Sequence, residues 1–204
     1  YRFCKETSWI GEIFIQDAFG TCHRPHASIV SVPKFLPSGA GLLLEKEIKA
    51  LDRLLENFKR PFVVIVGGKK VETKAKLLER FAKLADWVLV GNLIAKEMRE
   101  RKMGLVKEAK NIIWPQDGVE VDGEVFDIGV RTRQLFVEKV HSARTILWNG
   151  PLGKIEEEKF KEGTLTVAKA IAESKAFSVV GGGETVEFIN KYGFSGAFSH
   201  ISTG

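Results

Sequence analysis

Short apolar runs alternate with longer helix-like segments from about residue 60 onward, and this alternation limits the possible folds more than any other feature. The runs are PFVVIVGG (61–68), WVLVG (87–91), NIIWP (111–115), TILWNG (145–150), AFSVVGGG (176–183) and FSHIS (198–202). Between them, segments such as 129–141 and 163–174 have the periodicity of helices. Strands that alternate with helices of this length predict a parallel sheet covered on both faces. We therefore predict an α/β fold with a doubly wound, Rossmann-like parallel sheet.

The beginning of the chain has a different pattern. WIGEIFIQ (9–16) predicts one strand, and the leucine-rich segment further on predicts a long helix, with Ser38 as its N-cap and Arg60-Pro61 at its end. The predicted parts are 1–37, the remnant of something else; 38–60, a helix that joins the two; and 61–204, the doubly wound domain. Because the chain begins without methionine and stops at Gly204 directly after an apolar run, we expect a fragment, truncated at its end.

Composition narrows the class of protein. Hydrophobic residues make up 44% of the 204 positions and mean hydropathy is near zero, so the chain can bury a substantial core. The net charge of +5 suits an anionic ligand, which includes nucleotides, phosphorylated metabolites and nucleic acids. Basic residues never form a run of five, so a dedicated nucleic-acid surface is not favoured.

Cysteine spacing and hydropathy indicate the compartment. Cys4 and Cys22 have neither metal-binding nor Cys-x-x-Cys spacing, which predicts free thiols in a reducing environment. No apolar run approaches membrane-spanning length, and no basic segment followed by an apolar one occurs at the start. We expect a cytoplasmic protein that does not associate with membranes.

Three of the predicted strands lead into glycine turns, at Gly67-Gly68, Gly91 and Gly181-Gly182-Gly183. Such turns lie at the sheet edge where ligands bind in these folds. In GGKKVETK (67–74), the glycines allow a ligand to approach the backbone, and Lys70 and Lys74 share one helix face that can neutralise phosphate. The segment does not have the Walker A pattern. The alternative interpretation is a tight turn followed by a solvated basic helix.

GGGETVEF (181–188) repeats this arrangement. Glu184 at the helix start can hold Mg²⁺ through water, while Thr185 and backbone amides hold phosphate. The alternative is an acidic residue that merely stabilises the helix N-terminus.

A third strand end, WNGPLGKIEEEKF (148–160), combines an amide with carboxylates. Asn149 can hydrogen-bond a ligand, and one residue of the cluster Glu156, Glu157 and Glu158 can bind ribose hydroxyls. The alternative for the cluster is a solvated run of charge.

The loop DAFGTCHRPHAS (17–28) gathers His23, Arg24 and His26 within four positions, which predicts recognition of phosphate or carboxylate. Metal binding by the histidines is less favoured, because no further ligand is nearby.

Together these segments resemble the phosphoglycerate kinase family over essentially the whole chain. The motifs that carry the resemblance are DAFGTCHRPHAS, FLPSGAGLLLEKE, RPFVVIVGGKKV, WNGPLG, KFKEGT, VVGGGETV and FSHISTG. The family has two α/β domains joined by a hinge helix; the N-terminal domain binds 3-phosphoglycerate, and the C-terminal domain binds MgATP or MgADP. The resemblance therefore implies that residues 1–37 are the remnant of a second α/β domain. The resemblance implies reversible phosphoryl transfer between 1,3-bisphosphoglycerate with ADP and 3-phosphoglycerate with ATP.

The resemblance also implies roles for individual residues. It implies a nucleotide site formed by Gly68, Lys69, Lys74, Gly91, Asn149, Pro151, Glu156, Gly181, Gly182, Gly183, Glu184 and Thr185. Lys70 matches the catalytic lysine that follows the phosphoryl group, and Glu184 stands where an aspartate usually serves the metal. His23, Arg24 and His26 match the substrate-binding basic patch.

Departures from the family pattern limit what the chain is expected to do alone. Glu184 is longer than the usual aspartate, Lys69 replaces a usual alanine, and Gly91-Asn92 replaces a glycine-rich turn. The family's N-terminal Arg-x-Asp-x-Asn-x-Pro strand and the Gly-Gly-Ala-Ser segment after Ser-Thr-Gly have no match. We therefore expect a monomer that binds ADP or ATP with Mg²⁺ but does not complete transfer to 3-phosphoglycerate.

Three hypotheses remain open at this point. The chain is an incomplete portion of a phosphoglycerate kinase, or an isolated, non-catalytic ADP/ATP-binding module. A basic α/β protein that binds nucleic acid is the third and least favoured, because no aromatic stacking positions accompany the basic residues.

Overall fold

The computed structural model describes residues 10–69, 71–100 and 109–204. Contacts divide the chain into two compact units, residues 1–56 with 203–204 (unit 1) and residues 57–202 (unit 2). Among the described residues, no helix has both the length and the apolar character needed to cross a bilayer.

Unit 1 contains a two-stranded parallel sheet and a long helix. Its elements are β1 (Phe14–Gln16), η2 (Phe19–Thr21), α2 (Ala27–Val30), η3 (Val32–Lys34), β2 (Ser38–Ala40) and α3 (Leu42–Leu55).

The predicted long helix forms, but the N-cap prediction is wrong, because Ser38 lies in β2. The Asp17 carboxylate instead accepts a hydrogen bond from the Leu44 amide at 2.9 Å. A Cβ at Gly41 would lie 2.3 Å from that carboxylate carbon, so glycine allows Asp17 to cap α3.

A buried carboxylate also ties the last described residues to α3. Glu47 is fully buried and accepts hydrogen bonds from the Thr203 amide at 2.7 Å and the Thr203 hydroxyl at 2.8 Å.

Unit 1 exposes most of the large hydrophobic side chains that are exposed among the described residues. They are Ile10, Ile13, Ile15, Val30, Phe35, Leu42, Leu43 and Ile48.

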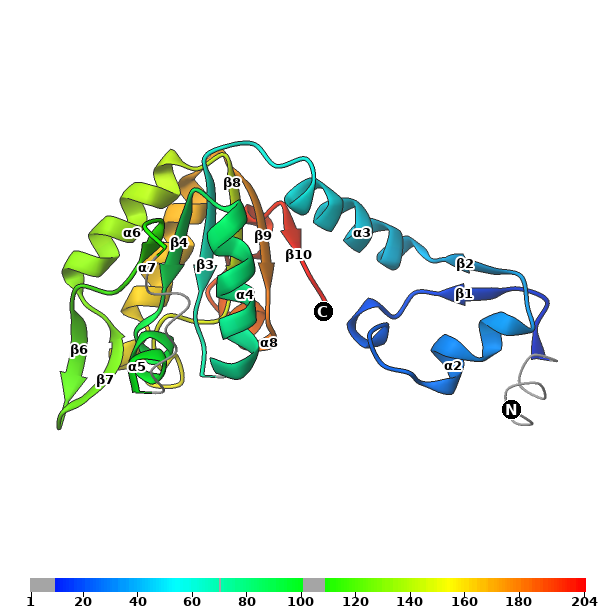
Figure 1. Cartoon of the computed structure of the whole chain (residues 1–204), viewed down its shortest axis with the longest axis horizontal. Helices are drawn as coiled ribbons and strands as arrows, with labels where there is room; N and C mark the ends of the chain where they lie inside the picture. The colour runs from blue at the N-terminus through cyan, green and yellow to red at the C-terminus, as the bar shows by residue number, and fades with distance from the viewer. Residues whose placement is uncertain (1–9, 70, 101–108) are drawn as a thin grey trace. The chain divides into compact units, whose positions relative to one another are not determined.

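Unit 2 is built on a six-stranded sheet in which every pair is parallel. Its strands are β3 (Phe62–Val66), β4 (Trp87–Val90), β5 (Ile112–Ile113), β8 (Thr145–Asn149), β9 (Phe177–Gly181) and β10 (His200–Ile201). The spatial order is β5-β4-β3-β8-β9-β10, so the chain first builds outward from β3 in one direction and then returns to build in the other (Figure 1). In doubly wound sheets this reversal point, here between β3 and β8, is where ligands bind.

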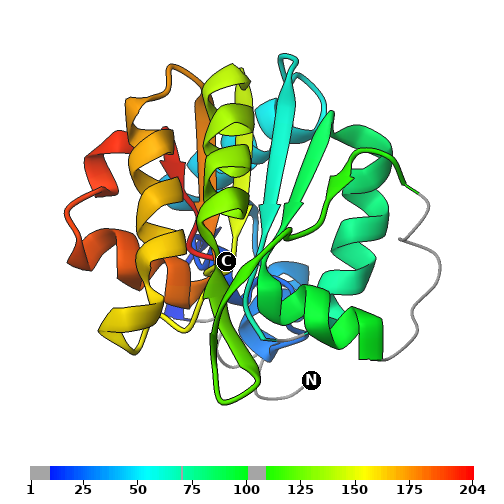
Figure 2. The ribbon, with the colours of Figure 1, turned by 90° about the vertical axis from the view of Figure 1, so that its left-hand side faces the viewer.

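Helices cover both faces of this sheet, which confirms the predicted fold class. They are α4 (Val71–Leu84), α5 (Asn92–Glu100), α6 (Val130–Ser142), α7 (Glu162–Glu173) and α8 (Gly183–Lys191). Figure 2 shows α6 and α7 side by side against the sheet. These two helices and α8 share one apolar cluster, with Val140, Val167 and Phe188 packed among residues of the central strands. On the opposite face Phe62 packs edge-on against Phe81 of α4, with 6.0 Å between ring centroids.

A β-hairpin lies between β5 and α6, and the sequence reading above did not predict it. It consists of β6 (Gly118–Val121) and β7 (Glu124–Ile128), which pair antiparallel. Asp122 and Gly123 form its turn with φ values of 53° and 80°. An Asp-Gly pair between alternating apolar and polar residues is a strong hairpin signal, so this element was predictable.

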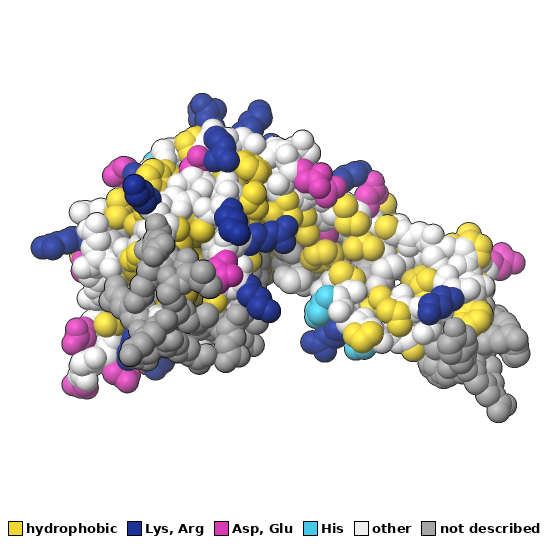
Figure 3. Space-filling model, in the orientation of Figure 1, with side chains coloured by type: hydrophobic (Ala, Val, Ile, Leu, Met, Phe, Trp, Pro, Cys, Tyr) yellow, Lys and Arg dark blue, Asp and Glu magenta, His cyan; other side chains and the backbone are white. Residues whose placement is uncertain are grey.

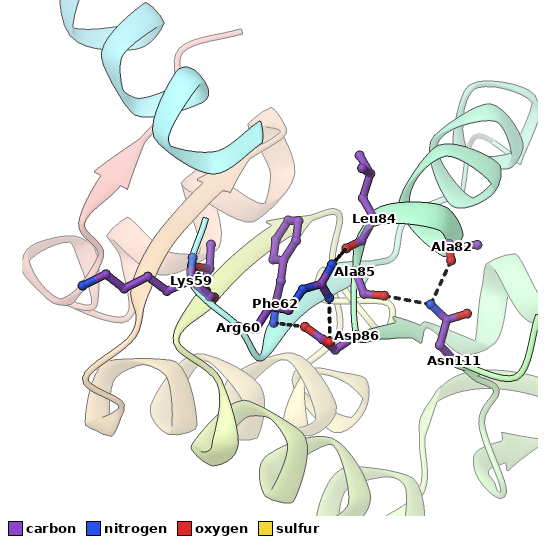
Figure 4. Close-up of polar contacts among 9 residues, drawn as sticks. Lys59, Arg60, Phe62, Ala82, Leu84, Ala85, Asp86 and Asn111 are labelled. Carbon is purple, nitrogen blue, oxygen red and sulfur yellow. Dashed lines mark hydrogen bonds and ion pairs between the residues drawn. The ribbon is translucent and has the colours of Figure 1, made fainter. Parts of the chain in front are cut away.

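Polar groups at the amino ends of the strands are occupied in holding the sheet together (Figure 4). Asp86 binds the Arg60 guanidinium at 2.6 Å and accepts a hydrogen bond from the Phe62 amide, also at 2.6 Å. The Asn111 amide donates to the carbonyls of Ala82 and Ala85 at 2.9 and 2.8 Å.

Basic side chains are distributed over the surface. On the face drawn in Figure 3, Lys and Arg side chains occupy several separate places rather than one continuous stripe.

Candidate functional site

The carboxyl ends of the central strands lie level with one another. The register pairs Val66 of β3 with Val90 of β4 and with Asn149 of β8, and Asn149 with Gly181 of β9. The turns that follow these strands therefore converge at one edge of the sheet. This is the edge predicted for the glycine turns that follow the strands.

Two of these turns are joined directly through their backbones. The Gly67 amide donates to the Asn149 carbonyl at 3.0 Å, and the Gly68 amide donates to the Pro151 carbonyl at 2.8 Å. A Cβ at Gly67 would lie 2.1 Å from the Pro151 oxygen, and a Cβ at Gly150 would lie 2.1 Å from the Gly67 oxygen. Gly150 also has a φ of 96°, so only glycine permits this close approach.

An open cleft of about 440 Å³ lies between the turns. Its lining residues are Gly67, Gly68, Lys69, Lys74, Asn149, Gly150, Pro151, Gly182, Gly183, Glu184 and Thr185. Nine of these were predicted site residues; Gly67 and Gly150 were not singled out as such, although their motifs were. The cleft also contains the N-terminus of α8, whose free amides and dipole favour an anion.

Lys74 is a half-buried cation at this cleft. Its ammonium contacts the Asn149 side-chain oxygen and lies 3.5 Å from the Asn149 carbonyl. Desolvation by burial lowers the pKa of Lys74, and the nearby charge of Glu184 opposes that shift. An anion in the cleft would meet an ammonium that is already positioned and partly stripped of water, which strengthens their attraction.

Thr185 holds two of the turns together. It is fully buried, and its hydroxyl accepts a hydrogen bond from the Gly150 amide at 3.0 Å. The Trp148 indole N–H donates to the Gly150 carbonyl at 2.9 Å, so both polar backbone groups of Gly150 have partners. The Thr185 hydroxyl keeps its own hydrogen for another acceptor.

Glu156 lies beside the cleft rather than in it. It lines a smaller pocket of about 180 Å³ together with Ile155, Glu184, Glu187, Phe188 and Lys191. A hydrogen bond from its own backbone amide and pairing with Lys69 lower the pKa of Glu156, while desolvation opposes them. Since Glu184 lines both pockets, they adjoin one another.

A buried aspartate supports the loop that leads from Asn149 to α7. Asp127 is fully buried, and its carboxylate accepts hydrogen bonds from the Ile128 amide at 2.8 Å and the Gly163 amide at 2.6 Å. A Cβ at Gly153 or Gly163 would lie 2.3 Å from this carboxylate. Burial raises the pKa of Asp127 to about 6, although the two amides act in the opposite direction. The sequence reading missed Asp127, because a single acidic residue carries no signal of burial.

The remaining predicted residues lie outside the cleft lining. Gly91 is buried at the end of β4, where a Cβ would lie 3.4 Å from the Gly67 Cα, and Gly181 ends β9. His23, Arg24 and His26 are exposed in unit 1. Lys70 lies outside the described residues.

The residues of the cleft fit a Mg²⁺ ion that is held mainly by the phosphates of a bound ligand. No group of three or more His, Cys, Asp or Glu side chains that could enclose a metal occurs among the described residues. Glu184, exposed at the first turn of α8, is the carboxylate at the cleft. One carboxylate combined with phosphate oxygens and waters is the usual way in which proteins hold this ion.

Comparison with known proteins identifies relatives over the whole chain. The family model described as phosphoglycerate kinase matches residues 2–105 and 98–204. A phosphoglycerate kinase of Finegoldia magna is 36% identical over 99% of this chain and 61% of its own length. One of Thermus thermophilus is 37% identical over 96% of this chain and 60% of its own length.

Solved structures give the same result. The phosphoglycerate kinase from Coxiella burnetii superposes with a TM-score of 0.89 at 32% identity, covering 99% of this chain and 62% of that one. The enzyme from Pyrococcus horikoshii gives a TM-score of 0.84 at 33% identity, covering 100% of this chain and 63% of that one. The chain thus spans about three-fifths of the length of these relatives.

Proposed function

This chain belongs to the phosphoglycerate kinase family, and from that premise we propose that it forms the nucleotide-binding part of a phosphotransferase. The proposed reaction transfers a phosphoryl group reversibly between 1,3-bisphosphoglycerate with ADP and 3-phosphoglycerate with ATP. Residues 61–204 provide the nucleotide domain, residues 38–60 the hinge with α3 as its helix, and residues 1–37 the tail of the domain that binds phosphoglycerate.

One observation carries the proposal: the polar groups of the cleft converge where the strand order reverses. There the Lys74 ammonium, the Asn149 amide and the start of α8 face one cavity. Phosphoryl transfer depends chiefly on positioning the phosphates and stabilising their charge, and these groups are suited to both tasks.

The proposal assigns roles to individual residues of the predicted site. Lys74, Thr185 and the amides of Gly182 and Gly183 bind phosphates, and Glu156 binds the ribose hydroxyls. Lys70 follows the phosphoryl group during transfer. Mg²⁺, held beside the phosphates by Glu184, would neutralise their negative charge.

The acceptor side of the reaction is proposed on the basic loop of unit 1. His23, Arg24 and His26 are exposed and can bind the phosphate or carboxylate of phosphoglycerate. We further propose that the chain works as a monomer in the cytoplasm and binds neither nucleic acid nor membranes.

The second candidate is a nucleotide-binding module without catalysis. The observation in its favour is that every residue that lines the cleft belongs to unit 2. Calorimetric titration with ADP and Mg²⁺ tests what both candidates share, and saturable one-site binding is expected. Absence of binding would contradict both.

A chimera separates the two candidates. This chain would replace the matching three-fifths of the Thermus thermophilus relative, and turnover would be followed in a coupled assay with ATP and 3-phosphoglycerate. Turnover by the chimera, with none by the 204-residue chain alone, is the expected result. A chimera that binds ADP but produces no turnover would favour the module.

A further inference from the structure

An ion pair lies at the junction of the two adjoining pockets. The Lys69 ammonium and the Glu156 carboxylate are 3.1 Å apart, and their side chains are 54% and 55% exposed. Lys69 lines the cleft between the turns, whereas Glu156 lines the adjoining smaller pocket. The two residues are 87 positions apart in the sequence and belong to different turns of unit 2.

We propose that Lys69 is a specificity-determining residue that makes the site favour phosphorylated nucleotides over nucleosides. The proposal rests on the proposed nucleotide site. Without ligand, the Lys69 ammonium is paired with the Glu156 carboxylate, which is the proposed partner of the ribose hydroxyls. A ligand that reaches Glu156 must therefore open the pair and release a positive charge at the wall of the cleft.

Nucleosides and phosphorylated nucleotides differ in what they offer to the released Lys69 ammonium. A nucleoside offers nothing to replace the carboxylate, so it binds against the cost of opening the pair. ADP and ATP place phosphates in the cleft, where the released ammonium adds to the charge of Lys74. Lys69 thus lowers the affinity of the site for a nucleoside and raises its affinity for phosphorylated nucleotides.

The expected size of the effect follows from the exposure of the pair. Half-exposed ion pairs are screened by water, and their contribution corresponds to at most about a fivefold change in an equilibrium constant. Lys69 therefore adjusts selectivity without closing the site.

Calorimetric titration of the 204-residue chain with adenosine, ADP and ATP tests the proposal. In Lys69→Ala, adenosine should bind up to about fivefold more tightly and ATP up to about fivefold more weakly. The matched control is Lys76→Ala, which removes an exposed lysine of α4 outside the cleft and should change neither affinity. In a Glu156→Gln background, Lys69→Ala should no longer change the affinity for adenosine.

Two other outcomes are distinguishable. If Lys69→Ala changes the affinities for all three ligands by the same factor, or changes none, Lys69 does not determine selectivity, while the nucleotide site stands. If the unmodified chain binds neither ADP nor ATP, the proposed function fails and this inference fails with it.

Discussion

The Thr185 hydroxyl accepts a hydrogen bond from the Gly150 amide at 3.0 Å, and this contact joins the start of α8 to the turn after β8. Both groups are buried, so the amide has no water to replace its partner. Since Gly150 separates Asn149 from Pro151, the hydrogen bond fixes the turn that carries two proposed nucleotide contacts.

Removing this hydroxyl should destabilise the fold and the site together. Thr185→Val keeps the side-chain shape but leaves the Gly150 N–H unpaired, at a cost of about 1–3 kcal/mol in the free energy of unfolding. Thr185→Ser retains the acceptor and should lose only about 1 kcal/mol for the missing methyl group. Urea unfolding followed by tryptophan fluorescence measures both. Equal losses in the two variants would show that the hydrogen bond is unimportant.

Lys74→Ala should weaken ADP binding by about tenfold or more, because it removes a charge-assisted contact worth about 1.5–3 kcal/mol. Lys76→Ala, on the exposed face of α4, should leave the ADP affinity unchanged. Calorimetry on the two variants and the unmodified chain gives the comparison. Identical ADP affinities in all three proteins would remove Lys74 from the phosphate site.

Glu184→Gln tests whether Glu184 contributes to Mg²⁺ binding. The substitution keeps the side-chain size and removes the negative charge at the cleft, so the ADP affinity should lose its dependence on Mg²⁺. The control is Glu187→Gln, because Glu187 lines only the smaller pocket. If the Mg²⁺ titration of Glu184→Gln matches that of the unmodified chain, Glu184 serves only the helix N-terminus.

The sheet and its site were predictable because fully buried parallel strands read as continuous apolar runs. β3 is buried at every position, and the run PFVVIVGG shows both this strand and the turn that follows. Glycines after three such runs marked the correct edge of the sheet, since the carboxyl ends of parallel strands share one edge.

Contacts between distant segments were not predictable from local patterns. Asp17 caps α3 from 27 positions away, and a local N-cap rule therefore selected Ser38 instead. The Lys69–Glu156 pair spans 87 positions, whereas the neighbouring Glu157 and Glu158 pair with nearby lysines. Nothing in the charged run shows which of its glutamates pairs with Lys69. Pairings of this kind depend on strand order, which a single sequence does not specify.

Asp127 should make stability depend on pH. Its pKa is raised from 3.8 to about 6, so the folded state binds the proton more tightly than the unfolded chain does. Stability from this group is therefore greatest at low pH and falls as pH rises from about 4 to about 6, by on the order of 3 kcal/mol. Urea unfolding across this range, compared with Asp127→Asn, should show the advantage of the unmodified chain shrinking as pH rises.

Asp117 is a control for Asp127, because its contribution to stability should change with pH in the opposite direction. Desolvation opposes the shift, but hydrogen bonds from the Thr132 hydroxyl and the Arg131 amide lower the pKa of Asp117. The advantage of the unmodified chain over Asp117→Asn should therefore shrink as pH falls below the ordinary range of an aspartate. Parallel pH profiles for the two variants would contradict the assignment of Asp127 as the buried, proton-binding carboxylate.

Gly67→Ala should open the contact between the turns after β3 and β8. The new Cβ would lie 2.1 Å from the Pro151 oxygen, a backbone atom that can move only if the two turns separate. We expect a loss of about 1–3 kcal/mol or more in the free energy of unfolding, as for other overpacked sites, and weaker ADP binding. Gly183→Ala is the matched control, because a Cβ there would point into open space and the position begins α8. That variant should be neutral or slightly more stable, since alanine favours helix and restricts the unfolded chain. Equal stability of the two variants would mean that the turns tolerate separation, and the close approach of Gly67 to Pro151 would then not be what shapes the cleft.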